Sequence, residues 1–357
     1  MTGRERLHCS FAHIQPDYPP VDFFSTPEIT QGLRNHFRTQ DDDQILEALG
    51  VDIRYVNPPY IGPPLEKFND GSEIDVWGIR KKPMPNEYGD YAEPVNFPFA
   101  GWVKIDDAEK YLWPRPDWYD YSAIQKLYRR YEDLAVATGG FYVQDFINSI
   151  AYGRGVEQVL IDIALDDPVY HFIVEKRHRF YMEVIGRTLE AAKGRIDFVL
   201  CGDDFGTQRD LLLSPETFDR IFAPLKKEFF DMVHSYGAKV SHHSCGSTVK
   251  LFPRFIEIGM DALQTIQPKA SGMDPYELKK KFGERITLHG AVDVQGWLQK
   301  ASASEIRREI FRLSEEVGVG GGYILSPSHN FQPDTPIENV LSVYRSIFEF
   351  RGMTVPF

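Results

Sequence analysis

The chain has 357 residues, of which 42% are hydrophobic and 26% charged, and this composition excludes disorder and collagen-like repeats. Lys and Arg number 40 against 52 Asp and Glu, so the net charge is −12, which disfavours nucleic acid and anionic membrane surfaces as partners. No stretch approaches the roughly 20 apolar residues of a membrane helix, and the amino terminus lacks the apolar run of a signal peptide. Three distant cysteines, Cys9, Cys201 and Cys245, form no disulfide framework and favour a reducing cytoplasm.

The first 120 residues are rich in proline and aromatic residues and contain only short strand-like pieces, such as residues 52–56. Proline-rich runs interrupt regular elements, whereas the aromatic content argues against a flexible linker. We therefore expect residues 1–120 to form an elaborated extension packed on the barrel of a single domain that spans residues 1–357.

From about Asp120, short apolar segments alternate with helical patterns. Several helices have start signals, namely Ser214-Pro215, Asp274-Pro275, the Ser302 to Glu305 capping box and Thr335-Pro336. The alternation predicts right-handed βαβ units and a parallel sheet. The predicted strands are 134–142, 198–203, 238–243, 262–267, 286–291 and 322–327.

The position of the glycines favours a closed barrel over an open sheet. An open nucleotide-binding sheet carries its glycine-rich phosphate loop after an early strand. The only dense glycine run, residues 318–322, comes late and precedes a strand. We therefore predict an α/β fold of the (β/α)8 type, in which residues at the carboxyl ends of the strands build the site.

The strongest local signal is the segment from Val240 to Gly246. Side chains alternate along a strand, so His243 and Cys245 point to one side, and His242 and Ser244 to the other. An imidazole and a thiolate at a strand end can chelate a borderline-soft ion, and zinc is the natural choice. The alternative is that Cys245 is a small buried hydrophobe and His243 a core histidine.

A second signal follows the predicted strand 322–327. A barrel would bring His329 to the same rim as His243 and Cys245, and three protein ligands with an open position are the catalytic zinc pattern. His329 could instead be a general acid/base or a loop histidine bonded to backbone. Asp334 is better suited to positioning this loop.

Other polar residues lie near predicted strand ends. Asp203 and Asp204 could perform acid/base work, although we expect one to face the site and the other to cap a turn, without knowing which. Asp293 could orient a ligand or substrate. Gln267 is a rim candidate for substrate binding. His289, four residues before Asp293, is either a second such candidate or a residue one layer deeper.

The order of motifs resembles the uroporphyrinogen decarboxylase superfamily, clearly so from about residue 195 to 350. The motifs are G-D-D-F-G-T-Q from Gly202, S-P-E-T-F from Ser214, H-S-C-G-S from His243, H-G-A-V-D from His289 and the run from Ser328 to Asn339. The resemblance implies a (β/α)8 barrel with one of two chemistries. One branch decarboxylates a porphyrinogen without a cofactor, and the other contains zinc-dependent methyltransferases that work with a corrinoid protein, such as the coenzyme M methyltransferases.

Two features favour the methyltransferase branch. The arginine-rich amino-terminal motif of the decarboxylases has no counterpart in residues 1–60, and H-x-C at His243 and Cys245 matches the methyltransferases. Aligned on Thr335-Pro336, their third ligand, a cysteine, falls on His329. Because the decarboxylases also have a histidine there, which serves substrate binding, His329 is either a ligand or a substrate group.

The resemblance implies a zinc-dependent methyltransferase with His243, Cys245 and His329 as metal ligands and Asp203, Asp204 and Asp293 as catalytic candidates. Its cofactors would be Zn2+ and a methylated corrinoid supplied by a partner protein, and its substrate a small molecule whose heteroatom is activated on zinc. Residues that bind the corrinoid are not identified, and the sequence leaves a homodimer open. The alternatives are a cofactor-free decarboxylase and a non-catalytic barrel that binds a tetrapyrrole.

Overall fold

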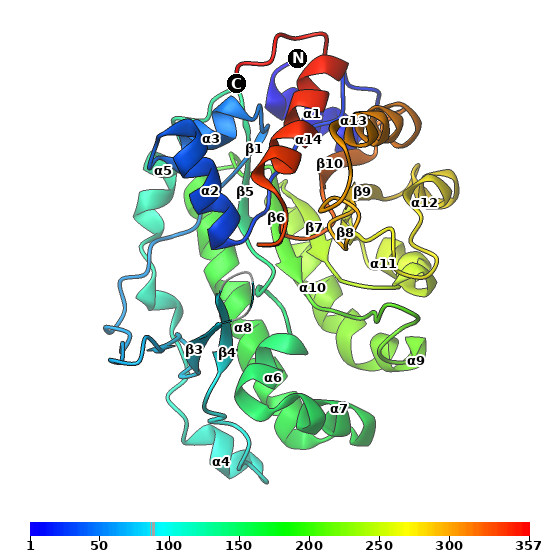
Figure 1. Cartoon of the computed structure of the whole chain (residues 1–357). Helices are drawn as coiled ribbons and strands as arrows, with labels where there is room; N and C mark the ends of the chain where they lie inside the picture. Colours follow the sequence, from blue (N-terminus) through cyan, green and yellow to red (C-terminus); the bar gives the residue numbers. More distant parts are fainter. Residues whose placement is uncertain (86, 88–89) are drawn as a thin grey trace.

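The computed structural model describes residues 1–85, 87 and 90–357, and its centre is a parallel sheet of seven strands (Figure 1). Each strand pairs with the next one in the sheet in chain order. The five strands from β6 onward agree with their predicted ranges within one residue at each end, and β5 ends three residues before its predicted range does. The strands are β1 (Ile53–Tyr55), β5 (Ala135–Gly139), β6 (Phe198–Gly202), β7 (Lys239–His243), β8 (Ala262–Ile266), β9 (Thr287–Val292) and β10 (Tyr323–Pro327).

The two edges of this sheet meet through Val21. Val21 forms a parallel bridge with Leu325 of β10. Its carbonyl oxygen also accepts a hydrogen bond of 2.9 Å from the backbone N–H of Asp52, directly before β1. The segment around Val21 therefore occupies the eighth strand position, and the fold is the predicted (β/α)8 barrel.

Helices surround the sheet (Figure 1). Each strand from β5 to β10 is followed by at least one helix, as the right-handed crossover between parallel strands requires. The helices that cover these crossovers, and the one that follows β10, are α6 (Asn148–Arg154), α7 (Val156–Leu165), α8 (Pro168–Ala192), α9 (Pro215–Thr217), α10 (Ala223–Ser235), α11 (Phe252–Glu257), α12 (Pro275–Phe282), α13 (Ala303–Arg312) and α14 (Ile337–Phe350).

The predicted helix starts agree with the structure in three cases. The side chains of Ser214, Asp274 and Ser302 accept hydrogen bonds from the first turns of their helices, and Ser302 forms the capping box with Glu305. The fourth differs, because α14 begins at Ile337 and Pro336 takes the cap position. Thr335 lies one residue too early to cap, and its buried hydroxyl has no hydrogen-bond partner among the described residues.

The first 120 residues contribute more than a covering layer, because β1 and Val21 belong to the barrel itself. We expected residues 1–120 to form an extension outside the barrel, but β1 pairs with β5 and is therefore part of the central sheet. The division of the chain into one domain stays a proposal. The helices of this region are α1 (Gly3–Phe11), α2 (Pro27–Phe37), α3 (Asp42–Ala48) and α4 (Ile105–Glu109), and α5 (Ile124–Tyr128) follows it.

A small antiparallel sheet lies beside the barrel, next to α6 and α8 (Figure 1). Its strands are β2 (Glu73–Ile74), β3 (Arg80–Pro85) and β4 (Asp90–Pro94). Buried Trp77, in the turn before β3, packs on Phe180 and Tyr181 of α8 with ring centroids 5.0 and 5.9 Å apart. These aromatic contacts hold the proline-rich segment against the barrel.

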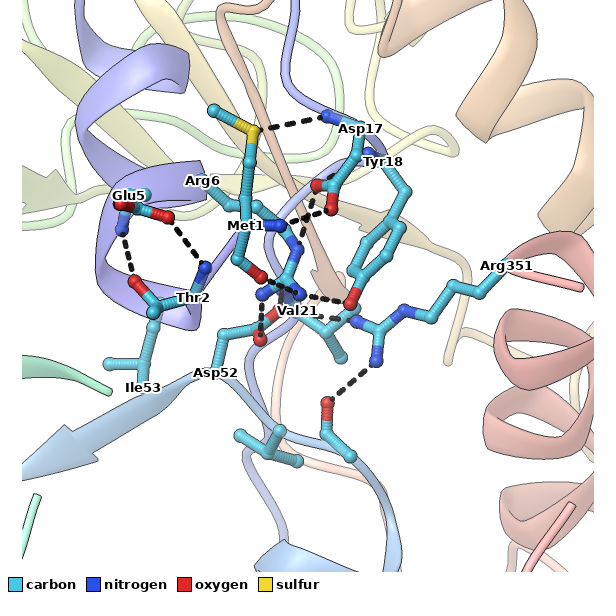
Figure 2. A network of polar contacts seen from close by, with 12 residues as sticks. Met1, Thr2, Glu5, Arg6, Asp17, Tyr18, Val21, Asp52, Ile53 and Arg351 are labelled. Carbon is cyan, nitrogen blue, oxygen red and sulfur yellow. Dashed lines mark hydrogen bonds and ion pairs between the residues drawn. The ribbon is translucent and has the colours of Figure 1, made fainter. Parts of the chain in front are cut away.

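The amino-terminal end of the barrel is filled by apolar residues and ringed by paired charges. Leu7 and Phe11 of α1 pack into the barrel interior, where the ring centroids of Phe11 and Phe198 are 5.9 Å apart. Figure 2 shows Arg6 between the carboxylates of Asp17 and Asp52. Arg351, just after α14, also pairs with Asp52, at 3.1 Å, so both ends of the chain are bound to one carboxylate.

Within the described part of the chain, no helix combines the length and the apolar character needed to cross a membrane.

Candidate metal centre

The three predicted metal ligands meet at the carboxyl-terminal end of the barrel. His243 is the last residue of β7, Cys245 follows two residues later, and His329 lies two residues after β10. Their potential ligand atoms all lie within 4.8 Å of one another. Cys245 Sγ and His243 Nε2 are 3.3 Å apart. The predicted alternation along β7 and the shared rim of the barrel are sufficient to explain this arrangement.

Gln264 of β8 fixes the orientation of the His243 ring. The side-chain oxygen of Gln264 accepts a hydrogen bond from Nδ1 of His243. Because Nδ1 then carries the ring proton, the lone pair of Nε2 points toward Cys245. A partner on the second ring nitrogen is the usual arrangement for a histidine that binds a metal.

The turn after Cys245 requires a glycine. Gly246 has a φ of +80°, and a Cβ at this position would lie 2.6 Å from the backbone carbonyl carbon of Gly206. Only glycine adopts this conformation so close to another backbone without strain. The tight turn therefore holds Cys245 at the end of β7, against the loop that follows β6.

The donor set fits a zinc ion. One thiolate and two imidazoles are typical zinc ligands, with bonds of about 2.3 Å to sulfur and about 2.0–2.1 Å to nitrogen. In a tetrahedral site, a sulfur and a nitrogen donor lie about 3.5 Å apart. The separation of 3.3 Å between Cys245 and His243 is close to this value, and His329 completes the three protein ligands of a catalytic site.

The environment sets the protonation of two of these groups. Burial, together with the neighbouring His243, lowers the pKa of His329 to about 4, so its imidazole is neutral at pH 7. Burial and the carboxylate of Asp204 raise the pKa of the Cys245 thiol. A bound cation would reverse the effect on the thiol, because metal binding replaces its proton.

His329 lacks the second partner that His243 has. Among the described residues, none forms a hydrogen bond with the His329 ring, whose closest aromatic neighbour is His243 at a centroid distance of 5.9 Å. A ligating histidine usually donates its other N–H to an acceptor. The half-buried ring instead faces the cavity described below.

The two adjacent aspartates have different surroundings. Asp203 is fully buried, where it pairs with Lys226 at 3.4 Å and accepts hydrogen bonds from the backbone N–H groups of Phe146 and Ile147. Its carboxylate is used to hold the loop after β5 in place and does not reach the cavity. Asp203 therefore takes the turn-capping position that we expected of one of the two aspartates.

Asp204 is the aspartate that faces the site. Its Oδ1 accepts a hydrogen bond of 2.7 Å from the backbone N–H of Cys245 and lies 3.5 Å from Nε2 of His243. Its Oδ2 accepts one of 2.8 Å from Asn148 at the start of α6. The side chain keeps 25% of its surface exposed. Asp204 is therefore held next to two of the three candidate ligands.

Gln267 lies on the cavity wall, as predicted, and touches Cys245. Its amide nitrogen is 3.7 Å from Cys245 Sγ, and its oxygen accepts a hydrogen bond of 2.7 Å from the N–H of Gly246. In a regular strand, Gln264 and Gln267 would face opposite sides. The pairing of β8 with β9 shifts between Gln264 and Ile266, so both glutamines reach the metal centre.

His289 and Asp293 lie off the cavity wall. His289 is completely buried inside the barrel, beside Phe24 and 3.2 Å from a carboxylate oxygen of Asp22. Asp293 caps a turn by accepting a hydrogen bond of 2.7 Å from the N–H of Gln295. His289 therefore occupies the deeper layer that was its alternative position, and Asp293 does not belong to the described cavity wall.

His242 points away from the centre, as the alternation along β7 predicts. It is completely buried among aromatic rings, with centroids of Phe205 and Phe255 at 5.9 and 6.2 Å. Burial lowers the pKa of His242 well below its usual value. His242 is therefore a neutral core residue.

A cavity of about 1060 Å³ opens over the metal centre, and Cys245, Gln267 and His329 form part of its wall. On the side of the small sheet, its wall includes Lys81, Glu87 and Tyr91. Lys81 is the one cationic side chain in the described lining, against the carboxylates of Glu28, Glu87 and Asp334. The rest of the described wall combines apolar surface with six side-chain amides, which suits a small neutral or weakly charged substrate.

The sequence did not single out two residues of this site. Gln264 is a polar residue inside a fully buried strand, and that could have marked it. Asn148 had no such signal, because it reaches Asp204 only through the turn that starts α6.

The fold and the site define a (β/α)8 barrel with a candidate metal centre at the end where such barrels carry their chemistry. Residues 152–350 match the family model described as uroporphyrinogen decarboxylase. Because this match covers more than half of the 357 residues, the chain belongs to the uroporphyrinogen decarboxylase family.

Individual proteins resemble the chain more loosely. A uroporphyrinogen decarboxylase from Thermus thermophilus is 29% identical over 189 residues, which cover 52% of this chain and 50% of the relative. One from Solibacter usitatus is 25% identical over 142 residues, covering 39% and 38%. The chain thus spans about half the length of the curated relatives, or less. A methyltransferase from Methanosarcina mazei has the same fold along 98% of this chain and 99% of its own, with a TM-score of 0.63 and 16% identity.

Proposed function

We propose that the protein is a zinc-dependent methyltransferase that moves a methyl group between a corrinoid protein and a small substrate. The observation that carries the proposal is the convergence of His243, Cys245 and His329 within 4.8 Å beside a cavity of about 1060 Å³. The membership in the uroporphyrinogen decarboxylase family and the resemblance of the fold to a methyltransferase support it. A thiolate ligand needs a reducing compartment, which favours the cytoplasm.

A zinc ion held by these three residues would bind the substrate heteroatom and lower its pKa, so that it becomes a nucleophile near neutral pH. Gln264 keeps the Nε2 lone pair of His243 directed at the site. Asp204 holds the backbone of Cys245 and, at 3.5 Å from His243 Nε2, is placed to orient the substrate. Of the two adjacent aspartates, we therefore keep Asp204 as the catalytic candidate.

The methyl group would pass directly between the two partners. The corrinoid would supply the methyl group: the bond from carbon to the substrate heteroatom would form as the bond from carbon to cobalt broke, and cobalt would keep the electron pair. The opposite direction is the exact reverse. The corrinoid would be presented by its own protein at the mouth of the cavity.

The charge of the cavity argues against the decarboxylase alternative. A porphyrinogen carries several carboxylates, and binding them requires several cations. The described lining offers Lys81 alone, against three carboxylates. The same argument applies to a barrel that binds a tetrapyrrole with carboxylate side chains without catalysis.

The test combines zinc analysis with methyl transfer from methylcobalamin to small thiols and other heteroatom acceptors, followed by the absorbance of the cobalt–methyl bond. We expect the zinc-loaded protein to demethylate methylcobalamin and His329→Ala to bind zinc at least tenfold more weakly. His329→Cys should recover zinc, because a thiolate binds it at least as well.

Two outcomes would revise the proposal. If His329→Ala keeps its zinc and loses only turnover, His329 contacts the substrate and is not a ligand. If the metal-free protein decarboxylates a porphyrinogen and the zinc-loaded protein leaves methylcobalamin intact with every acceptor tried, the methyltransferase proposal is wrong.

A further inference from the structure

A second cavity, of about 250 Å³, lies between the small sheet, α6 and α8. Six aromatic side chains line it and give it flat, apolar walls, namely Trp77, Tyr119, Tyr142, Tyr152, Phe180 and Tyr181. Walls of this kind hold a planar ligand by stacking and edge contacts.

Arg177 of α8 lies in the wall of this cavity, with only 1% of its surface exposed. Its Nε and Nη1 atoms are buried and have no hydrogen-bond partner among the described residues. The described residues also place no carboxylate within 4.0 Å of its guanidinium, which lies 3.9 Å from the centre of the Trp77 ring. A buried charge without a counter-ion is costly, so the cavity lacks an anion that would pair with Arg177.

The other charged residues of the cavity do not supply this anion. Asp75 accepts hydrogen bonds from the N–H groups of Trp77 and Ile79, at 2.9 and 3.1 Å. Its second oxygen pairs with Lys81 at 3.2 Å. Because Asp75 and Lys81 balance each other, Arg177 leaves the described lining with one net positive charge.

We propose that this cavity binds the carboxylate of a small planar organic acid, with the carboxylate on Arg177 and the flat body between the aromatic rings. A guanidinium binds a carboxylate through two parallel hydrogen bonds, one from Nη2 and one from Nε or Nη1, and the last two have no partner among the described residues. The predominance of rings over further cations favours an organic acid over inorganic phosphate.

The location connects this cavity with the metal centre. Lys81 and Tyr152 line both cavities, and Lys81 lies 4.8 Å from the centre of the Tyr152 ring. A ligand anchored at Arg177 is therefore directed toward the larger cavity, where Cys245 and His329 lie. This extends the proposed function by assigning its substrate to the aromatic carboxylic acids. The binding of such an acid does not depend on the proposed function, but its role as the substrate does.

The test measures the binding of benzoate to the full chain by titration calorimetry, with benzamide as the neutral analogue of the same shape. We expect benzoate to bind at least tenfold more tightly than benzamide. Arg177→Met should lose this preference, and Arg177→Lys should keep part of it. Arg179→Met is the matched control, because Arg179 lies on the same helix but is exposed and paired with Glu175 and Glu228.

The comparison of benzoate with benzamide uses the unaltered protein, so it remains decisive even if Arg177→Met does not fold. Equal binding of the two compounds, or no binding of either, would overturn the proposal, and Arg177 would then serve packing against Trp77. Inorganic phosphate that binds as well as benzoate would overturn the assignment to an organic acid.

The outcome can be separated from that of the proposed function. Cys245→Ala removes a candidate zinc ligand outside this cavity and should therefore bind benzoate as the unaltered protein does. Benzoate binding without methyl transfer would leave the carboxylate site in place and contradict the methyltransferase. Methyl transfer without a preference for carboxylates would support the methyltransferase and contradict the carboxylate site.

Discussion

Charged side chains form ion pairs with one another at one end of the barrel, whereas polar side chains surround a cavity at the other end. At the amino-terminal end, Arg6 and Arg351 are neutralised by Asp17 and Asp52, and the ring of Tyr18 lies 3.9 Å from both guanidinium groups (Figure 2). At the carboxyl-terminal end, a thiol, imidazoles and amides surround a cavity. In (β/α)8 barrels, the first end serves stability and the second serves function.

A comparison of individual arginines makes the same point. Arg6 and Arg177 are both buried, but Arg6 has two carboxylate partners and Arg177 has none among the described residues. Groups that are paired within the protein hold the fold together. Polar groups beside a cavity that have no hydrogen-bond partner among the described residues, such as Arg177 and the ring of His329, indicate where a ligand is expected.

The largest effect on stability should come from Asp52→Asn. This change leaves the buried guanidinium groups of Arg6 and Arg351 facing a neutral group, and breaking a buried ion pair costs about 3–5 kcal/mol. We expect urea unfolding to show a loss of this size, while the folded protein keeps its zinc. Asp42→Asn, which breaks the exposed pair with Arg34, should change the transition little. A loss of zinc without a loss of stability would contradict the division between the two ends.

A second effect at the same end should depend on pH. Burial opposes the ionisation of Asp197, but hydrogen bonds from His8, the N–H of Val136 and Arg4 outweigh it and lower its pKa. A lowered pKa stabilises the fold above the unfolded value of about 4, and this contribution is lost as the pH falls through the folded value.

We therefore expect Asp197→Asn to lower the unfolding free energy by about 2 kcal/mol at pH 7, as for hydrogen bonds to a charged group. The difference from the unaltered protein should shrink as the pH falls below about 4. Denaturant titrations at several pH values measure it. A difference in unfolding free energy that grows toward acid pH would contradict a lowered pKa of Asp197.

A smaller effect is expected at the opposite end from Gln264→Leu. This variant removes the acceptor for Nδ1 of His243 and frees the ring to change its orientation. Loss of such a partner typically costs about tenfold in metal affinity. Competition with a chelator should detect this change. Gln208→Leu, on the cavity wall but exposed, is the matched control, and equal weakening in both variants would contradict the role of Gln264.

The sequence predicted those parts of the site that follow from regular geometry. The alternation along β7 placed His243 and Cys245 on one side and His242 on the other, and the shared rim of a barrel placed His329 near them. The sequence could not place Gln264 and Gln267 together, because this depends on an irregular pairing of β8 with β9.

Short elements escaped prediction for a different reason. Residues 52–56 are strand-like in sequence, but β1 has three residues and Val21 forms a single bridge, so neither is long enough for a periodic pattern that would assign it to the barrel. The roles of Asp203 and Asp204 depended on which carboxylate meets Lys226, a contact between β6 and α10 that spacing along the chain does not reveal. The lack of a hydrogen-bond partner for Nε and Nη1 of Arg177 among the described residues is likewise a property of the packed structure alone.

The most direct test measures zinc content and unfolding free energy on the same samples of Cys245→Ala and of His242→Phe. We expect Cys245→Ala to bind zinc at least 100-fold more weakly, while its metal-free unfolding free energy stays within about 0.5 kcal/mol of the unaltered protein. His242→Phe should keep full zinc, because its ring faces Phe205 and Phe255. Full zinc in Cys245→Ala, or loss of zinc in a folded His242→Phe, would contradict a metal centre built from His243, Cys245 and His329.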